Sequence, residues 1–261
     1  MARPASIEKV TEVKHYTDNL FSFKITRPGT FRFKPGQFIM LGLEVNGKPL
    51  MRAYSMASGP YDEQLEFYSI KIPDGPLTSK LQHIKKGDEV LLSEKAVGNL
   101  TPWDVRPGSR LFLLSTGTGI APFASILRDP DTYNGFEKIV LTQTCRNLED
   151  LSYGRRLLDS LVNDPLCGDD ANSKLLSHFS VTQEKNPPES VFYGRITDLM
   201  KSKQLFKNLS IHSFDPDTDR VLVCGSIEMV KEVGSILDTF DMRHSSGKEH
   251  REYAYERAFV G

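Results

Sequence analysis

The sequence contains no long apolar run and carries little net charge. No stretch of its 261 residues approaches the roughly 18 apolar residues that a membrane-spanning helix needs, and the N-terminal segment Met-Ala-Arg-Pro-Ala-Ser lacks the apolar core of a secretion signal. The 33 basic and 34 acidic residues nearly cancel, which argues against a nucleic-acid-binding protein. We therefore expect a cytoplasmic protein that binds neither a membrane nor nucleic acid.

Cysteine is also scarce. The chain has three cysteines, Cys145, Cys167 and Cys224. Because their number is odd and their spacing is wide, they exclude a paired disulfide framework and a CxxC motif. Iron–sulfur clusters need grouped thiolates, so we expect no such cluster and no other metal in this chain. The sequence has neither an internal repeat nor a low-complexity tract.

The first part of the chain has the rhythm of an antiparallel β-barrel. Short β-rich runs alternate with turn residues such as Lys34-Pro-Gly36 and Val45-Asn-Gly47. A short helix is expected at Thr78–His83. The runs predicted as strands are Lys9–Tyr16, Leu20–Thr26, Gln37–Glu44, Met51–Ala57, Gln64–Ile72 and Glu89–Ser93.

The second part alternates apolar runs with helical patterns, which is typical of a parallel α/β sheet. A proline-containing linker, Thr101–Gly108, separates the parts, so we predict a domain of residues 1–104 and a domain of residues 105–261. Asp164–Lys174 and Ser213–Asp219 are expected to be surface loops. The predicted strands are Arg110–Ser115, Lys138–Thr144, His178–Thr182 and Val221–Cys224, with helices from Ala121, Leu151, Ile196 and Ile227, the last ending at Phe240.

A glycine turn joins the first of these strands to its helix. In Ser115-Thr-Gly-Thr-Gly-Ile-Ala-Pro122, Gly117 and Gly119 allow a tight turn and a close approach of the backbone to a ligand. The free N–H groups at the start of the following helix favour an anion. This pattern predicts a site for the phosphates of a nucleotide.

A second cluster, Arg52-Ala-Tyr-Ser55, lies in the predicted barrel. Arginine offers a rigid fork to a pyrophosphate, tyrosine a flat face to a ring, and serine a hydroxyl to a ring nitrogen, a combination that suits a flavin. Alternation along a strand puts Arg52 and Tyr54 on one side and Ser55 on the other, unless a bulge intervenes. An ordinary strand with a surface arginine and a packed tyrosine is the alternative.

The order of motifs along the chain resembles that of the ferredoxin–NADP(+) reductase family and its bacterial ferredoxin/flavodoxin branch. Besides the two clusters above, the motifs that carry the resemblance are Gly75-Pro-Leu-Thr-Ser79, Cys224-Gly225 and the ending Glu256-Arg-Ala-Phe-Val-Gly261. The resemblance implies a barrel that binds FAD followed by an α/β domain that binds NADP. The implied FAD residues are Arg52, Ala53, Tyr54, Ser55, Tyr68, Ser69, Ile70, Pro76, Leu77, Thr78, Thr118, Ala258 and Phe259. The implied NADP residues are Gly117, Gly119, Thr144, Arg146, Arg195 and Gly225.

The resemblance also implies catalytic roles. Ser55 would lie beside flavin N5, Cys224 near the nicotinamide C4, and Glu256 would relay a proton toward Ser55. The alternative for Cys224 is a small buried hydrophobe. The aromatic C-terminal tail should dock, with Ala258 against the flavin ring and Phe259 near the adenine, or should simply pack on the core.

A preference for NADP over NAD needs cations for the 2′-phosphate. Arg146 and Arg195 follow predicted strands and meet this need, while the family commonly has an arginine where this chain has Gln183. Solvated loop arginines are the alternative interpretation.

We therefore predict a monomeric FAD enzyme that takes hydride from NADPH and passes single electrons to ferredoxin or flavodoxin. Two other functions stay open at this point. One is an NADH-dependent reductase module serving an oxygenase or a siderophore, and the other is a flavin-binding redox sensor without turnover.

Overall fold

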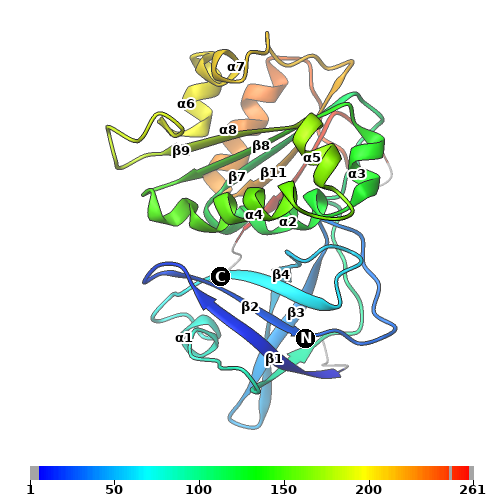
Figure 1. Ribbon diagram of the computed structural model, residues 1–261, viewed down its shortest axis with the longest axis vertical. Coiled ribbons are helices and arrows are strands. Elements are labelled where there is room, and N and C mark those ends of the chain that lie inside the picture. The colour runs from blue at the N-terminus through cyan, green and yellow to red at the C-terminus, as the bar shows by residue number, and fades with distance from the viewer. Residues whose placement is uncertain (1–5, 247–248, 259–261) are drawn as a thin grey trace.

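The computed structural model describes residues 6–246 and 249–258 and has two sheets stacked one above the other in Figure 1. The N-terminal sheet is antiparallel, with the strand order β4-β3-β6-β1-β2-β5. Its strands are β1 (Ser6–His15), β2 (Leu20–Thr26), β3 (Phe38–Val45), β4 (Lys48–Ser55), β5 (Gln64–Ile70) and β6 (Glu89–Leu92). All six predicted β-runs are therefore strands, with ends that differ by a few residues.

The N-terminal sheet curls around its own core. An irregularity in the β1–β2 register between Val10 and Glu12 strengthens the twist. The two outer strands, β4 and β5, approach each other, since the Tyr54 hydroxyl lies 3.5 Å from Ser69 Oγ. The enclosed core includes Phe23, Ile39 and Phe67. This arrangement confirms the predicted antiparallel barrel.

The C-terminal sheet is parallel throughout, with the order β10-β9-β8-β7-β11-β12. This confirms the predicted α/β domain. Its strands are β7 (Arg110–Thr116), β8 (Lys138–Cys145), β9 (Leu175–Val181), β10 (Phe192–Tyr193), β11 (Asp219–Gly225) and β12 (Tyr253–Arg257).

Helices cover both faces of the parallel sheet (Figure 1). Alternation along β7 sends Leu111 and Leu113 into a core with the first group of helices, and Phe112 and Leu114 into a core with the second. The first group is α2 (Ala121–Leu127), α3 (Pro130–Gly135), α4 (Ser152–Val162) and α5 (Gly168–Lys174). The second group is α6 (Ile196–Lys201), α7 (Gln204–Asn208) and α8 (Ile227–Asp238).

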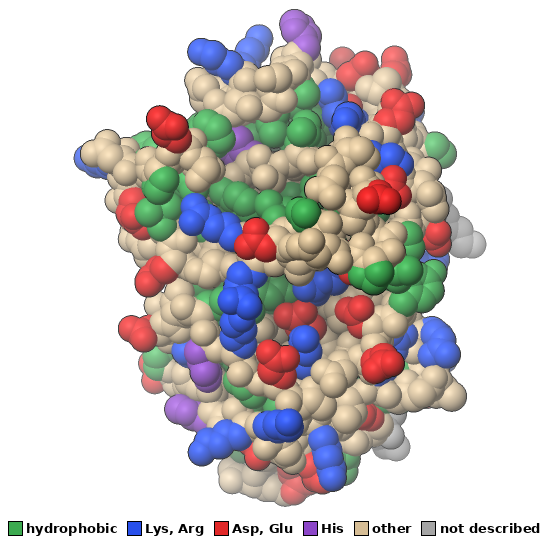
Figure 2. Space-filling view, in the orientation of Figure 1, with side chains coloured by type: hydrophobic (Ala, Val, Ile, Leu, Met, Phe, Trp, Pro, Cys, Tyr) green, Lys and Arg blue, Asp and Glu red, His purple; other side chains and the backbone are tan. Residues whose placement is uncertain are grey.

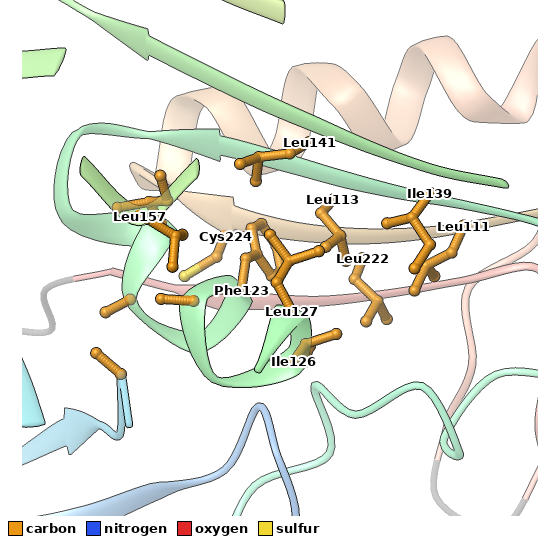
Figure 3. Packing of buried hydrophobic residues seen from close by; sticks show 14 of the residues in the cluster. Leu111, Leu113, Phe123, Ile126, Leu127, Ile139, Leu141, Leu157, Leu222 and Cys224 are labelled. Atoms are coloured by element: carbon orange, nitrogen blue, oxygen red, sulfur yellow. The ribbon is translucent and has the colours of Figure 1, made fainter. Parts of the chain in front are cut away.

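The core under α2 is tightly packed where it approaches the ligand-binding edge of the sheet. Figure 3 shows Phe123 and Leu127 of α2 directed at the strand residues Leu113 and Leu222, with Cys224 at the same layer. These side chains are fully or almost fully buried. The packing fixes the end of β7 and the start of α2, and therefore the turn between them.

One sequence prediction of local structure is wrong. Asp164–Lys174 is not a loop throughout, because Gly168–Lys174 forms helix α5, whose apolar contact with the core is made through Ala171. The tail does dock, but as the strand β12, which pairs with β11 along its whole length. Neither α3 nor α7 was expected.

The two domains are joined by a buried ion pair and an aromatic stack. Arg128, just after α2, contacts Glu66 of β5 at 2.9 Å and donates to the Ala57 carbonyl. Tyr153 of α4 stacks on Tyr68 of β5 with ring centroids 4.1 Å apart. Among the described residues, no helix is long and apolar enough to cross a membrane.

Candidate functional site

A cavity of about 940 Å³ lies at the carboxyl ends of the parallel strands, where ligands of open α/β sheets bind. It also reaches the barrel, since Asn19, Leu20 and Ile70 form part of its wall. The cavity brings together the following residues that were predicted from the sequence: Ile70, Gly117, Thr118, Thr144, Arg146, Arg195 and Ala258.

Different structural constraints favour glycine at the two positions of the turn. Gly117 has φ = +54°, and a Cβ there would meet no atom within 4 Å, so the peptide is open toward the cavity. At Gly119 a Cβ would lie 2.3 Å from the Cys224 carbonyl oxygen. Gly119 is not among the residues that line the cavity, and its close contact with β11 is sufficient reason for a glycine there, so its predicted contact with a pyrophosphate stays a prediction.

The turn is held from beneath by a buried amide that sequence reasoning missed. Gln143 of β8 donates from Nε2 to the Gly117 carbonyl at 3.2 Å. Gly154 of α4 makes room for this side chain, because a Cβ there would lie 2.1 Å from Gln143 Oε1. A polar residue within an otherwise apolar strand was the available signal.

Three exposed side chains stand together at the rim of the cavity. Arg146 follows β8, Arg195 precedes α6, and Gln183 is tied to Arg146 by a backbone hydrogen bond of 3.0 Å. Two arginines and one glutamine therefore line the same hollow. This arrangement agrees with the predicted placement of the arginines and puts Gln183 at the position where a further cation would reach the same ligand.

The N-terminus of α8 adds a feature that the sequence analysis did not use. Ser226 caps this helix by accepting from the Met229 N–H at 3.2 Å, and both residues line the cavity. A serine between the strand end Cys224-Gly225 and an amphipathic helix was the signal for it. Other lining residues that the sequence analysis missed are Asn19, Leu20, Asn147, Asp150, Thr182, Thr197, Glu228 and Glu232.

The barrel cluster lies on β4 beside β5. Arg52 is half-buried, and its hydrogen bond among the described residues is to the carbonyl of Met51 at 2.9 Å. Tyr54 packs edge-on against Phe67, and burial raises the pKa of its phenol. The β3–β4 register is regular up to Ser55, so no bulge brings Ser55 to the face of Arg52 and Tyr54, and Ala53 is exposed on that other face.

The neighbouring strand β5 carries Tyr68, Ser69 and Ile70. Tyr68 is buried in the domain interface, where its hydroxyl has no hydrogen-bond partner among the described residues. Ser69 faces Tyr54, and Ile70 reaches the cavity. Thus β5 connects the barrel cluster with the large cavity.

The segment 75–79, in which the resemblance implies FAD residues, offers few free side-chain groups. Thr78 begins a helix of only four residues, α1 (Thr78–Leu81), and its hydroxyl donates to the Ile72 carbonyl at 3.2 Å. Leu77 is 2% exposed in the barrel core. Any contact of Pro76, Leu77 and Thr78 with a ligand would therefore use mainly the backbone.

Cys224 is buried among apolar side chains and does not line the cavity. Burial raises the pKa of its thiol well above the ordinary value, and the neighbouring Glu256 raises it further. The Cys224 side chain is therefore a neutral thiol. This agrees with the alternative interpretation of Cys224 as a small buried hydrophobe. Gly225 follows it, and a Cβ there would lie 2.3 Å from Thr116 Oγ1.

Glu256 and Ala258 come from the docked tail. Glu256 pairs with Cys224 in the β11–β12 ladder, and its Oε2 is buried without a hydrogen-bond partner among the described residues, so no bond joins it to Ser55 here. Burial raises its pKa to about 7. Ala258 lines the cavity and donates from its N–H to the Gly225 carbonyl at 2.9 Å. Phe259 lies outside the described residues.

Comparison with known proteins defines the class first. Residues 4–96 match the family model described as oxidoreductase FAD-binding domain, and residues 113–234 match oxidoreductase NAD-binding domain. The chain is therefore a two-domain oxidoreductase of the flavin- and nicotinamide-nucleotide type, in agreement with the fold.

Full-length relatives then give the family. The chain is 48% identical to the flavodoxin/ferredoxin–NADP reductase of Rhodobacter capsulatus, covering 97% of this chain and 93% of that protein. It is 47% identical to the ferredoxin–NADP reductase of Pseudomonas aeruginosa, covering 97% of each. A ferredoxin NADP+ reductase from Neisseria gonorrhoeae, solved with bound FAD and NADP, superposes with a TM-score of 0.88 at 31% identity over 97% of this chain and 98% of that one. The chain belongs to the ferredoxin/flavodoxin–NADP reductase family.

Proposed function

We propose that this protein binds FAD and NADP(H) and exchanges electrons between NADPH and ferredoxin or flavodoxin. One observation carries the proposal. The large cavity is walled by Ile70 of the barrel, Thr118 of the glycine turn and Ala258 of the tail, so it joins the predicted sites of both nucleotides. FAD, when bound, accepts electrons in pairs and releases them singly, which matches a nicotinamide to a one-electron carrier.

The residues of the barrel fit a flavin nucleotide. Arg52 has guanidinium donors left after its bond to Met51, as a pyrophosphate requires. Tyr54 and Ser69 offer hydroxyls where β4 and β5 approach each other, and Thr118 and Ala258 line the same cavity as Ile70. We assign these residues, with Ser55 and the backbone at 76–78, to hold FAD.

The other end of the cavity fits NADP. The peptide at Gly117 is open, Thr144 pairs with Thr116 near the end of β8, and Arg146 and Arg195 supply positive charge at the rim. Electrostatic attraction to two guanidinium groups favours a nucleotide with a 2′-phosphate over one with a free hydroxyl. We therefore assign NADP rather than NAD.

Glu256 is the group suited to hold a proton. With a pKa of about 7, its carboxyl is protonated in about half of the molecules at neutral pH, so it both donates and accepts under working conditions. Its unpartnered Oε2 is the atom from which the proton would move. Cys224, as a neutral thiol beside it, would contribute shape rather than a charge.

The partner is proposed to be an acidic carrier, ferredoxin or flavodoxin, as the names of the relatives indicate. Basic and acidic side chains are interspersed on the face shown in Figure 2. Of the basic residues near the flavin domain, Arg27 is engaged by the carbonyls of Phe31, Pro60 and Asp62. The monomeric state and the cytoplasmic location stay proposals, and three free, buried cysteines suit a reducing compartment.

The test is an anaerobic reduction. Purified protein loaded with FAD should lose its flavin absorbance on addition of NADPH, much faster than with NADH, and should regain it on addition of oxidised ferredoxin or flavodoxin. Equal rates with NADH would favour an NADH-dependent reductase module. Bleaching without reoxidation by either carrier would favour a redox sensor, and a protein that retains no flavin would reject the proposal.

A further inference from the structure

A second cavity, of about 210 Å³, lies between the two domains and shares no lining residue with the cofactor cavity. Its barrel side comes from β1, β2 and β5, and its other side from α4 and the end of α2. The interdomain ion pair of Glu66 and Arg128 forms part of the wall. Nothing in the proposed electron transfer uses this hollow.

The charges around this interdomain cavity do not balance. Four of the lining side chains are cationic and two are acidic. Glu66 is paired with Arg128, and Glu12 is paired with Lys24 at 3.4 Å. Lys14 and Arg156 are left, and among the described residues neither has an acidic partner within 4.0 Å. The unmatched charge is positive, so the hollow favours an anion.

A buried hydroxyl faces the same space. Tyr153 is 3% exposed, and the hydrogen of its hydroxyl has no acceptor among the described residues, while the Arg128 guanidinium lies close enough to donate to the hydroxyl oxygen. The two charged side chains nearest in effect to this hydroxyl, Glu66 and Arg128, line the same cavity as Tyr153. A buried O–H without an acceptor is unfavourable, and an acceptor in the cavity would remove that penalty.

Further hydroxyls stand beside it. Tyr16 and Ser22, whose oxygens are 3.1 Å apart, both line the cavity. We propose that the interdomain cavity binds a small oxyanion, whose negative charge pairs with Lys14 and Arg156 and whose oxygen accepts from Tyr153. Both a phosphate and a small dicarboxylate have this chemistry.

The test uses the FAD-loaded protein carrying Arg146→Ala and Arg195→Ala, so that anion binding at the rim of the cofactor cavity is removed whatever nucleotide binds there. Inorganic phosphate and malonate are titrated separately by calorimetry, with ionic strength held constant by NaCl. Saturable binding of one anion per chain is expected, and the tighter of the two identifies the source. A cavity filled only by water would show no saturable heat with either anion.

Variants of the lining residues decide whether the heat comes from this hollow. Lys14→Ala and Arg156→Ala should each weaken binding about tenfold, as expected for the loss of a charged hydrogen bond at a partly exposed site. Tyr153→Phe keeps the ring on Tyr68 and should also weaken binding without lowering the melting temperature of the anion-free protein. Arg155→Ala, one residue along the same helix and outside the cavity, should bind normally. Binding that is unchanged in Lys14→Ala/Arg156→Ala would overturn the proposal.

Discussion

The two ends of the parallel sheet use charged residues in opposite ways. At the amino end, Asp219 of β11 is fully buried and accepts from Arg110 Nε at 2.8 Å and Nη2 at 2.7 Å. At the carboxyl end, Arg146 and Arg195 are exposed at the cavity rim, and Glu256 Oε2 has no partner among the described residues. The same residue types are satisfied internally at one end and left for a ligand at the other.

Arg220 completes the amino end. It is 2% exposed, and its guanidinium donates to the backbone carbonyls of Arg106, Pro107, Pro216, Asp217 and Asp219. These carbonyls belong to the segment that enters β7 and the loop that enters β11. All N–H donors of this guanidinium are engaged, so none is left for a ligand. Arg220 holds together the chain segments at the starts of β7 and β11.

The largest effect is therefore expected at the amino end. Asp219→Ala leaves Arg110 half-buried without its carboxylate and should lower the free energy of unfolding by about 3–5 kcal/mol. Urea denaturation followed by circular dichroism measures this change. Flavin reduction by NADPH in the remaining folded protein should be close to normal.

Asp170→Ala is the matched control, because Asp170 pairs with Lys174 on the surface of α5 at 3.0 Å. Such an exposed pair contributes about 0.3–0.5 kcal/mol, so the control should barely change the urea midpoint. If Asp219→Ala were equally mild, the distinction between the two ends of the sheet would not hold for stability.

The second prediction concerns the unpartnered carboxyl of Glu256. Its pKa is raised from 4.5 to about 7 by burial, so between these values the folded protein holds a proton that the unfolded chain has lost. The stability from this proton is complete below pH 4.5 and is lost as the pH rises through about 7. Glu256→Gln, which mimics the protonated form, should therefore equal the parent at pH 4.5 and exceed it by about 3 kcal/mol at pH 8.

The readout must be the difference between the two proteins, because His178 acts in the other direction. Burial lowers its pKa from 6.5 to about 4, so its contribution is lost as the pH falls below 6.5. Both proteins contain His178, and subtraction removes it. A difference in unfolding free energy that does not change with pH would show that Glu256 is not an isolated buried acid.

Most of the framework could be predicted from local pattern. Period-2 runs between glycine and proline turns located the six barrel strands, and apolar runs followed by helical periods located β7, β8, β9 and β11. Local pattern failed where tertiary contact decides the outcome. The tail Tyr253–Arg257 becomes a strand because β11 offers it a free edge, and Gly168–Lys174 becomes a helix that buries Gly168 and Ala171.

Some residues of the candidate site could likewise be predicted from local pattern, whereas others depend on tertiary contact. Gly117, Arg146 and Arg195 follow strand ends, and the rule that ligands bind there was sufficient to place them at the cavity. The support given by Gln143 depends on a missing side chain at Gly154, in a different element. The interior position of Cys224 likewise depends on packing by α2 and α4, which the order of residues does not reveal.

The third prediction tests whether the rim arginines serve a ligand. Arg146→Ala or Arg195→Ala should leave the unfolding free energy within about 0.5 kcal/mol, because both side chains are exposed. Each should raise the KM for NADPH about ten- to a hundredfold, through loss of a charged hydrogen bond of about 1.5–3 kcal/mol. The KM for NADH should hardly change. Equal losses with both nucleotides would mean that the arginines do not contact the 2′-phosphate.

The smallest effect is expected from adding a cation at the rim. Gln183 is exposed, lines the cavity and bonds through its backbone N–H to the Arg146 carbonyl, so Gln183→Arg would put a third guanidinium beside the first without disturbing the loop. An exposed charge pair contributes about 0.2–1 kcal/mol, so the KM for NADPH should fall by no more than about fivefold. Repulsion from Arg146 opposes the change in the free protein and disappears when a dianion binds between them, so the gain should be larger at low than at high salt.

Gln183→Met, which keeps the length without the charge, is the control. If Gln183→Arg lowered the KM for NADH as much as that for NADPH, the third guanidinium would contact a part of the nucleotide that both share, and the rim would not be the place where the 2′-phosphate is recognised.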